Sequence, residues 1–334
     1  MTYNVGYFFN KQLPFYGFDG YNARYLKENE DQNNTTFASR MYYRLDRAVI
    51  RCLLDFQYKT AYNPLRILAG VGYFDTRIKP VDIDKFNESL DDDDKILKNT
   101  TLFEKYVSNG IISEDEKDGG KCFILKSGVI YDTRDNETNA NRGIWAEVLL
   151  ISAPKPGNNT SFTQVGAVFR HYFTISAPRL TMANRIGIQT LVAGQKPFYM
   201  LPYLFSSYRL RDAFGGEKTI RGVLAQRIQG NGVAFGNFEL RYKFLYGRLF
   251  KQETYLCANV FADWGMVTSK YLDKPVPMAL ENEIKPGQEK PHWTTGAGLR
   301  VVMNQNFVVT ADYGRALDLQ DGKNALYITL GFLY

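Results

Sequence analysis

The sequence is poor in the residues on which several classes of protein depend. Among its 334 residues are two histidines and three cysteines, and Cys52, Cys122 and Cys257 lie far apart. Three separated cysteines form neither a disulfide framework nor the ligand spacing of a metal site. We therefore expect single thiols on strands, no metal and no other cofactor. No uninterrupted apolar run reaches the roughly 18 residues that a membrane helix requires.

The chain also lacks a strong excess of one charge and a recognisable catalytic motif. The net charge is only +6 and the basic residues are not clustered, which argues against a nucleic-acid partner. Neither His171 nor His292 adjoins a nucleophile motif, and the sequence contains no Gly-x-Ser-x-Gly. We therefore expect that the chain is not an enzyme.

Aromatic residues, by contrast, are abundant. The chain has 23 tyrosines and 23 phenylalanines, yet its mean hydropathy is −0.32. Apolar residues must therefore be interleaved with polar ones. A membrane β-barrel requires this pattern, because it is apolar outside, polar inside and girdled by aromatic residues at both interfaces. On composition alone, a soluble β-sandwich or lipocalin-like barrel fits equally well.

The residue pattern of segment 37–58 favours the membrane barrel. One face of its second half is apolar (Ala48, Ile50, Cys52, Leu54, Phe56 and Tyr58), and the other is polar and mostly charged (Arg47, Arg51, Asp55 and Gln57). Charges two residues apart along a strand suit a water-filled lumen. Patterns of this kind predict thirteen antiparallel strands, at 2–12, 22–30, 37–58, 66–79, 122–134, 144–152, 162–175, 180–194, 233–245, 253–267, 293–303, 306–316 and 325–334.

The connections between these strands alternate between long and short, as in outer-membrane barrels. One long connection is the acidic insert 80–121, with four consecutive aspartates at 91–94. No spacing in it fixes a coordination shell, so we predict a solvated surface loop in preference to a divalent-cation site. Another long connection begins near residue 154 and includes residues 154–159, and the connection 195–232 is the longest without a strand pattern apart from that insert.

Connection 195–232 contains Ile220, Arg221 and Gly222, and two further motifs follow it. Gly236 and Phe238 lie on the next strand, and Phe261, Asp263 and Gly265 on the one after. These motifs resemble those of the BamA/TamA family of outer-membrane assembly barrels, the bacterial surface antigen superfamily. That family has a [VI]-R-G-[FY] motif on its sixth extracellular loop, which folds back into the lumen, and G-x-F and F-x-D-x-G motifs on the next two strands. Here Val223 replaces the aromatic residue.

Strand alternation places Glu239 and Asp263 on lumenal faces of adjacent strands. A lone carboxylate in a partly dehydrated lumen is costly, and the planar fork of an arginine can serve two acceptors. We therefore predict that Arg221 enters the lumen and donates to Asp263, with Glu239 nearby, and that Gly236 and Gly265 let the loop approach the wall. The alternative is that Arg221 is an ordinary solvated loop residue.

The last ten residues predict an amphipathic strand. Ile328, Leu330, Phe332 and Tyr334 would share one face, with Gly331 turned inward. This segment resembles the C-terminal strand signal by which bacterial barrels are recognised for insertion, with tyrosine in place of the commoner terminal phenylalanine.

The resemblance also implies a strand count. The family barrel has sixteen strands, and its arginine loop joins strands eleven and twelve. The thirteen predicted here would leave the first three missing, and the N-terminus lacks the features of a signal peptide. We therefore expect residues 1–334 to be one barrel domain that is incomplete at its N-terminus.

By resemblance, the protein would be integral to the bacterial outer membrane and would insert, assemble or translocate other polypeptides there. Its partners would be outer-membrane lipid, unfolded outer-membrane or secreted polypeptides, and accessory periplasmic or lipoprotein subunits. The mechanism would be a weak seam between the first and last strands that accepts an incoming strand. Two alternatives remain: a passive or structural barrel, and the barrel anchor of an N-terminally fused patatin-like lipase.

Overall fold

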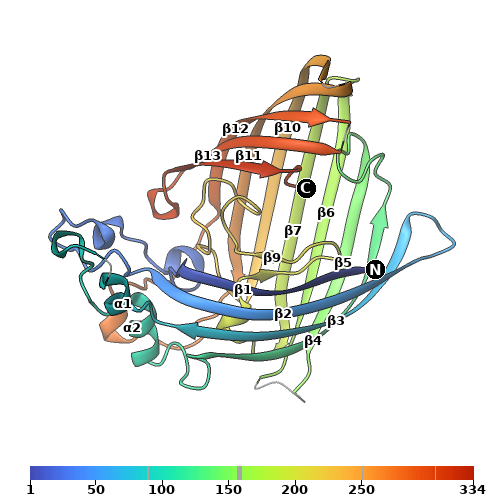
Figure 1. The fold of residues 1–334 in the computed structure, drawn as a ribbon. Coiled ribbons are helices and arrows are strands. Elements are labelled where there is room, and N and C mark those ends of the chain that lie inside the picture. The colour runs from blue at the N-terminus through green and yellow to red at the C-terminus, as the bar shows by residue number, and fades with distance from the viewer. Residues whose placement is uncertain (89, 156–159, 250, 305) are drawn as a thin grey trace.

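One antiparallel sheet dominates the structure, a computed structural model that describes residues 1–88, 90–155, 160–249, 251–304 and 306–334 (Figure 1). Each strand pairs with its neighbours along the chain, apart from the two short strands noted below. The strands of the large sheet are β1 (Thr2–Pro14), β2 (Arg44–Lys59), β3 (Leu65–Lys79), β4 (Gly119–Asp132), β5 (Gly143–Ala153), β6 (Phe162–Ser176), β7 (Leu180–Gly194), β10 (Gly232–Leu249), β11 (Gln252–Ser269), β12 (His292–Met303), β13 (Phe307–Ala316) and β14 (Asn324–Leu330).

The sheet curves around an interior that holds buried charged side chains beside a hydrophobic cluster, and it turns an apolar face outward. On β2, the Ile50 and Phe56 side chains are 46% and 57% exposed, whereas Arg47 and Arg51 are buried. A soluble barrel would reverse this distribution, because it buries its apolar face. The predicted all-β, antiparallel transmembrane barrel is therefore confirmed. No helix in the described part of the chain is long and apolar enough to span a membrane.

One predicted strand is wrong. Residues 22–30 contribute two short 3-10 helices, η1 (Gly20–Asn22) and η2 (Lys27–Glu30), so the large sheet has twelve described strands where thirteen were expected. Side-chain hydrogen bonds, and not strand pairing, hold this segment in place. Asp19 accepts from the backbone N–H groups of Tyr271 and Leu272, and Asn22 accepts from that of Gln288. The β1–β2 connection thus packs on the β11–β12 connection above the lumen.

The acidic insert between β3 and β4 is only partly the solvated loop that was expected. It contains α1 (Ile83–Asn87), η3 (Asp92–Asp94) and α2 (Leu102–Ser108). A capping box between Thr101 and Glu104 starts α2, and Leu102, Phe103 and Tyr106 are buried in the largest hydrophobic cluster. Of the connection predicted to include residues 154–159, residues 156–159 lie outside the described part of the chain.

Strands β1 and β14 form the two ends of the sheet. Among the described residues β1 pairs with β2 alone and β14 with β13 alone, so each presents one free backbone edge. The outward side chains of both strands are apolar and exposed, Tyr3, Val5 and Tyr7 on β1 and Ile328 and Leu330 on β14.

Candidate functional site: the lumenal loop

The connection between β7 and β10 re-enters the barrel. It begins with η4 (Phe198–Met200) and contains a two-stranded ribbon of β8 (Tyr203–Leu204) and β9 (Arg211–Asp212). Its apolar residues Phe214, Ile220, Val223 and Ile228 pack against the lumenal faces of β10 and β11. Val223 is buried, so it contributes hydrophobic contact where the family motif has an aromatic residue. We call residues 195–231 the lumenal loop.

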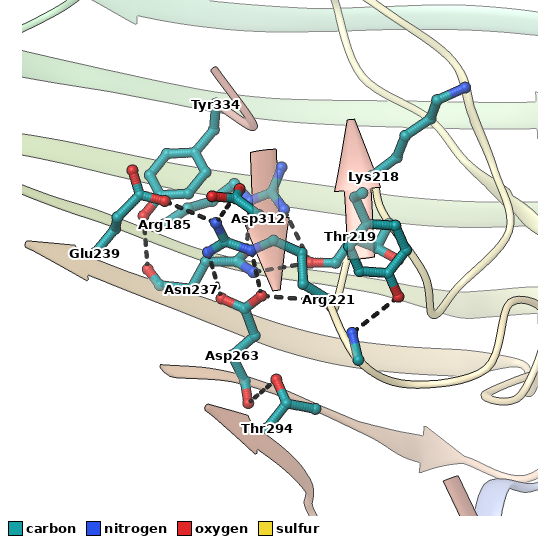
Figure 2. Close-up of polar contacts among 12 residues, drawn as sticks. Arg185, Lys218, Thr219, Arg221, Asn237, Glu239, Asp263, Thr294, Asp312 and Tyr334 are labelled. Carbon is teal, nitrogen blue, oxygen red and sulfur yellow. Dashed lines mark hydrogen bonds and ion pairs between the residues drawn. The ribbon is translucent and has the colours of Figure 1, made fainter. Parts of the chain in front are cut away.

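Arg221 is the most highly connected side chain of the lumenal loop, and it is 1% exposed. Its Nε and one terminal nitrogen donate to the two oxygens of Asp263, at 2.9 and 3.0 Å (Figure 2). Its other terminal nitrogen donates to Glu239 and to Asp312, both at 2.9 Å. The backbone N–H of Arg221 also donates to Asp263, at 3.0 Å. One guanidinium thus joins three strands of the wall.

Two further arginines complete the charge network. Arg241 donates to Glu239 at 2.6 Å, and Arg300 lies 3.0 Å from Glu239 and 3.5 Å from Asp312. Three guanidiniums (Arg221, Arg241 and Arg300) therefore meet three carboxylates, and the buried network is neutral. Neutrality matters because an unpaired charge in this setting is costly.

Burial and ion pairing act in opposite directions on the pKa of Arg221. Burial disfavours the charged form, but the carboxylates of Asp263 and Glu239 outweigh it and raise the pKa of Arg221 well above its ordinary value. The guanidinium carbon also lies 3.4 Å from the centre of the Phe261 ring, a cation–π contact. The guanidinium therefore stays charged and is held in one orientation.

Two glycines allow the loop backbone to approach the wall closely. A side chain at Gly265 would collide with Ile220, and one at Gly314 would lie 2.8 Å from the backbone carbonyl carbon of Arg221. Gly222 has a φ of +97°, and its N–H donates to the Tyr327 hydroxyl at 3.0 Å. Of these, Gly265 and Gly222 are among the residues expected from the sequence.

Two predicted site residues lie elsewhere. A side chain at Gly236 would collide with Trp264, so Gly236 does not face the lumenal loop. Phe238 lies two residues further along β10, on the same outward face, opposite Ala262 of β11. The physical reason is alternation: on β10 the lumenal positions are Asn237 and Glu239, and their neighbours necessarily point outward.

Sequence reasoning missed Asp312, Arg300, Arg241 and Tyr327 as parts of the network. The available signal was alternation on the last strands, which puts Asp312 and Arg300 at lumenal positions. A second connection was also missed: Asn237 donates to the Thr219 carbonyl at 2.8 Å and accepts from Arg185 at 2.8 Å. These bonds fix the backbone just before Arg221.

The C-terminal residues depart from the predicted strand. β14 ends at Leu330, and Gly331, with a φ of +87°, turns the chain into the lumen. Phe332 packs under the guanidiniums of Arg241 and Arg300, and the buried Tyr334 hydroxyl donates to the Ala183 carbonyl at 2.8 Å. The expectation that Phe332 and Tyr334 face lipid beside Leu330 is therefore wrong, because cation–π contacts hold them inside.

The chemistry that this site supports is mechanical attachment. Its carboxylates are neutralised by arginines, and among the described residues no group of three or more His, Cys, Asp or Glu is arranged to hold a metal ion. The buried His292, the first residue of β12, lies 2.6 Å from Asp321 in the β13–β14 connection. The arrangement ties a long loop to the barrel wall.

A curved, inside-out antiparallel sheet with a loop bound in its lumen defines a transmembrane β-barrel protein. A family model described as the Omp85 superfamily domain matches residues 2–332. The chain therefore belongs to the Omp85 superfamily and is an integral protein of the bacterial outer membrane.

A solved structure agrees with this fold. The chain is similar to the crystal structure of BamA from Haemophilus ducreyi lacking POTRA domains 1–3, with a TM-score of 0.51 and 15% identity over 86% of this chain and 53% of that one. It thus spans about half the length of that chain. It also matches the β domain of the Bordetella autotransporter BrkA, with a TM-score of 0.31 and 11% identity over 86% of this chain and 89% of that one. No curated protein matches the sequence.

Proposed function

We propose that this barrel inserts, assembles or translocates polypeptides at the outer membrane by offering the edge of its last strand, β14, to an incoming strand. The observation that carries the proposal is the sheet order, in which β14 has one neighbour among the described residues. Membership of the Omp85 superfamily and the fold shared with BamA support it.

The free edge of β14 has a physical consequence in a membrane. It presents backbone N–H and C=O groups that lipid cannot satisfy, and every unpaired group costs several kcal/mol in a hydrocarbon environment, by a rough general estimate. A polypeptide strand that adds to such an edge satisfies these groups through main-chain hydrogen bonds, irrespective of its sequence. A seam of this kind suits varied polypeptide substrates.

The lumenal loop contributes rigidity in this proposal. Arg221 joins β11, β10 and β13 through Asp263, Glu239 and Asp312, and β13 carries the edge strand β14. The network thereby holds the C-terminal edge in a fixed position relative to the wall. Periplasmic or lipoprotein subunits that deliver substrates are expected partners of this barrel.

Site-specific photocrosslinking tests the proposal. A photoreactive residue replaces Ile328 on β14, which is 73% exposed. The matched control is Ile186 on β7, which is 47% exposed and lies on a strand paired on both sides. We expect newly exported outer-membrane polypeptides to crosslink to Ile328 and not to Ile186.

A passive barrel is the second candidate, since the neutral charge network and the bound loop need no transport role. In that case the two positions would give the same crosslinks, to lipid alone, and the proposal would be wrong. If the barrel anchors a fused lipase, the two positions again behave alike, and lipase activity accompanies the intact protein from its native host.

A further inference from the structure

A buried lysine without a partner lies at the end of the barrel that carries the long loops, the extracellular end. Lys196 follows β7, is 2% exposed, and makes no hydrogen bond or ion pair with any residue that the structure describes. An isolated buried ammonium is among the most costly groups that a fold can contain. Its presence calls for a partner outside the described chain.

Lys196 lines a cavity of about 400 Å³. The walls come from three connections that are distant in sequence: the β3–β4 insert, the start of the lumenal loop, and the segment after β11. Two more lysines, Lys270 and Lys274, are exposed at this cavity. The site is thus assembled by the fold and does not follow from a run of basic residues.

The charges around the cavity favour an anion. When Lys196 is protonated, three lysines are opposed by Glu116 and Asp273, which leaves one excess positive charge. Glu116 is already engaged, because it accepts from the backbone N–H of Phe198 at 3.2 Å. Asp273 is exposed to solvent, where its charge is screened. Neither carboxylate forms an ion pair with Lys196 in the described structure.

We propose that this cavity binds a phosphate group, with Lys196 as its innermost ligand and Lys270 and Lys274 at its mouth. Lysine binds phosphate as a compact point charge, with three N–H donors that adapt to a tetrahedral anion. The volume accepts more than a bare ion, so the phosphate can be free or can belong to a phosphorylated glycolipid headgroup of the surrounding outer leaflet.

The protonation state of Lys196 gives the proposal a measurable consequence, which is proton uptake on binding. Burial lowers the pKa of Lys196 to about 7, partly offset by the neighbouring Cys122 thiol. The other titratable groups around it are Glu116, Tyr271, Asp273 and the two mouth lysines. Above pH 7 the amine of the empty cavity is therefore mostly neutral, and a bound phosphate dianion would restore its charge. Binding at about pH 8 must then take up a proton.

Calorimetric titration of the folded protein in detergent tests this, with inorganic phosphate as the probe in buffers of different ionisation enthalpy. We expect wild-type protein to bind phosphate with proton uptake at about pH 8. Lys196→Met should lose at least about tenfold in affinity and lose the proton uptake. Because Lys196→Met removes a buried charge, the variant should fold. Lys218→Met, an exposed lysine of the same loop, is the matched control and should bind as wild type does.

The source of the phosphate is resolved by competition. If vesicles containing a phosphorylated glycolipid displace inorganic phosphate and vesicles with the dephosphorylated glycolipid do not, the natural ligand chemistry is a lipid headgroup. If neither displaces it, the ligand is free phosphate. The proposal is overturned if wild-type protein binds neither probe, or if Lys196→Met binds both as tightly as wild type. Both results are independent of strand addition at β14.

Discussion

Removing Arg221 perturbs one carboxylate far more than the other two. In the part of the chain that the structure describes, the Asp263 carboxylate is contacted only by Arg221, through its backbone N–H and two side-chain nitrogens. Glu239 keeps Arg241 at 2.6 Å and Arg300 at 3.0 Å, and Asp312 keeps Arg300 at 3.5 Å. Arg221→Ala therefore orphans Asp263 in a network that is left with one excess negative charge.

Losing one partner of a buried pair costs about 3–5 kcal/mol, and lumenal water reduces this toward the lower value. A cost of about 3 kcal/mol raises the population of the detached loop roughly a hundredfold. Arg221→Ala and Asp263→Ala should each have this effect, whereas the double variant should be little worse than either, because the pair is lost once and two charges of each sign remain. Arg221→Lys should also fail, since one ammonium cannot reproduce the fork.

Limited proteolysis between residues 195 and 231 on membrane-embedded protein measures the detached population, provided that the loop opens and closes faster than it is cut. Arg209→Ala is the matched control, since Arg209 is an exposed arginine of the same loop without an ion pair among the described residues. Glu239→Gln should be milder than Asp263→Asn. If the effects of Arg221→Ala and Asp263→Ala simply add, the two residues do not share an interaction, and the attachment is misassigned.

Three other predictions follow from the same structure. Gly314→Ala should loosen the loop by about 1–3 kcal/mol, because its new methyl meets the Arg221 backbone, whereas Gly247→Ala has open space and should be neutral in the same proteolysis assay. Val260→Lys on the lipid face should cost about 2–4 kcal/mol of folding free energy in urea titrations in vesicles, and an equal effect of Glu253→Lys at the strand end would contradict the membrane placement. Burial raises the pKa of Asp19 to about 6. The contact of the Asp19 side chain with the β11–β12 connection is therefore most stable below the unfolded-state pKa, and it weakens by roughly 2–3 kcal/mol as pH rises from about 4 through 6. Hydrogen exchange of the Tyr271 and Leu272 amides should show this weakening in wild type and not in Asp19→Asn.

The strands were predictable because alternate residues of a barrel strand face the lipid and the lumen, and these two environments select apolar and polar side chains. Arg47 and Arg51 on one face of β2, with Ile50 and Phe56 on the other, fix both the strand and its inside-out orientation. The Arg221–Asp263 contact could be anticipated from a motif, and alternation placed Glu239 beside it. Asp312 and Arg300 obey the same rule, but the choice among many lumenal charges depends on three-dimensional register.

Residues 22–30 and 331–334 could not be placed in this way. In the first segment, the side chains of Asp19 and Asn22 bind backbone groups some 250 residues away, and no local pattern reports such contacts. In the second, alternation continues through Phe332 and Tyr334, but the left-handed Gly331 and the lumenal arginines redirect the chain. Long-range polar contacts overrode local periodicity in both segments.

Reconstituted assembly activity tests the central claim most directly. The protein, as its native host makes it, is placed in lipid vesicles, and the folding rate of an unfolded outer-membrane barrel is followed by its heat-resistant mobility on gels. The account predicts faster folding than in empty vesicles, with the gain reduced when proline replaces Ile328 on the β14 edge. A folding rate equal to that in vesicles containing a closed, unrelated barrel would contradict the account and leave a passive barrel.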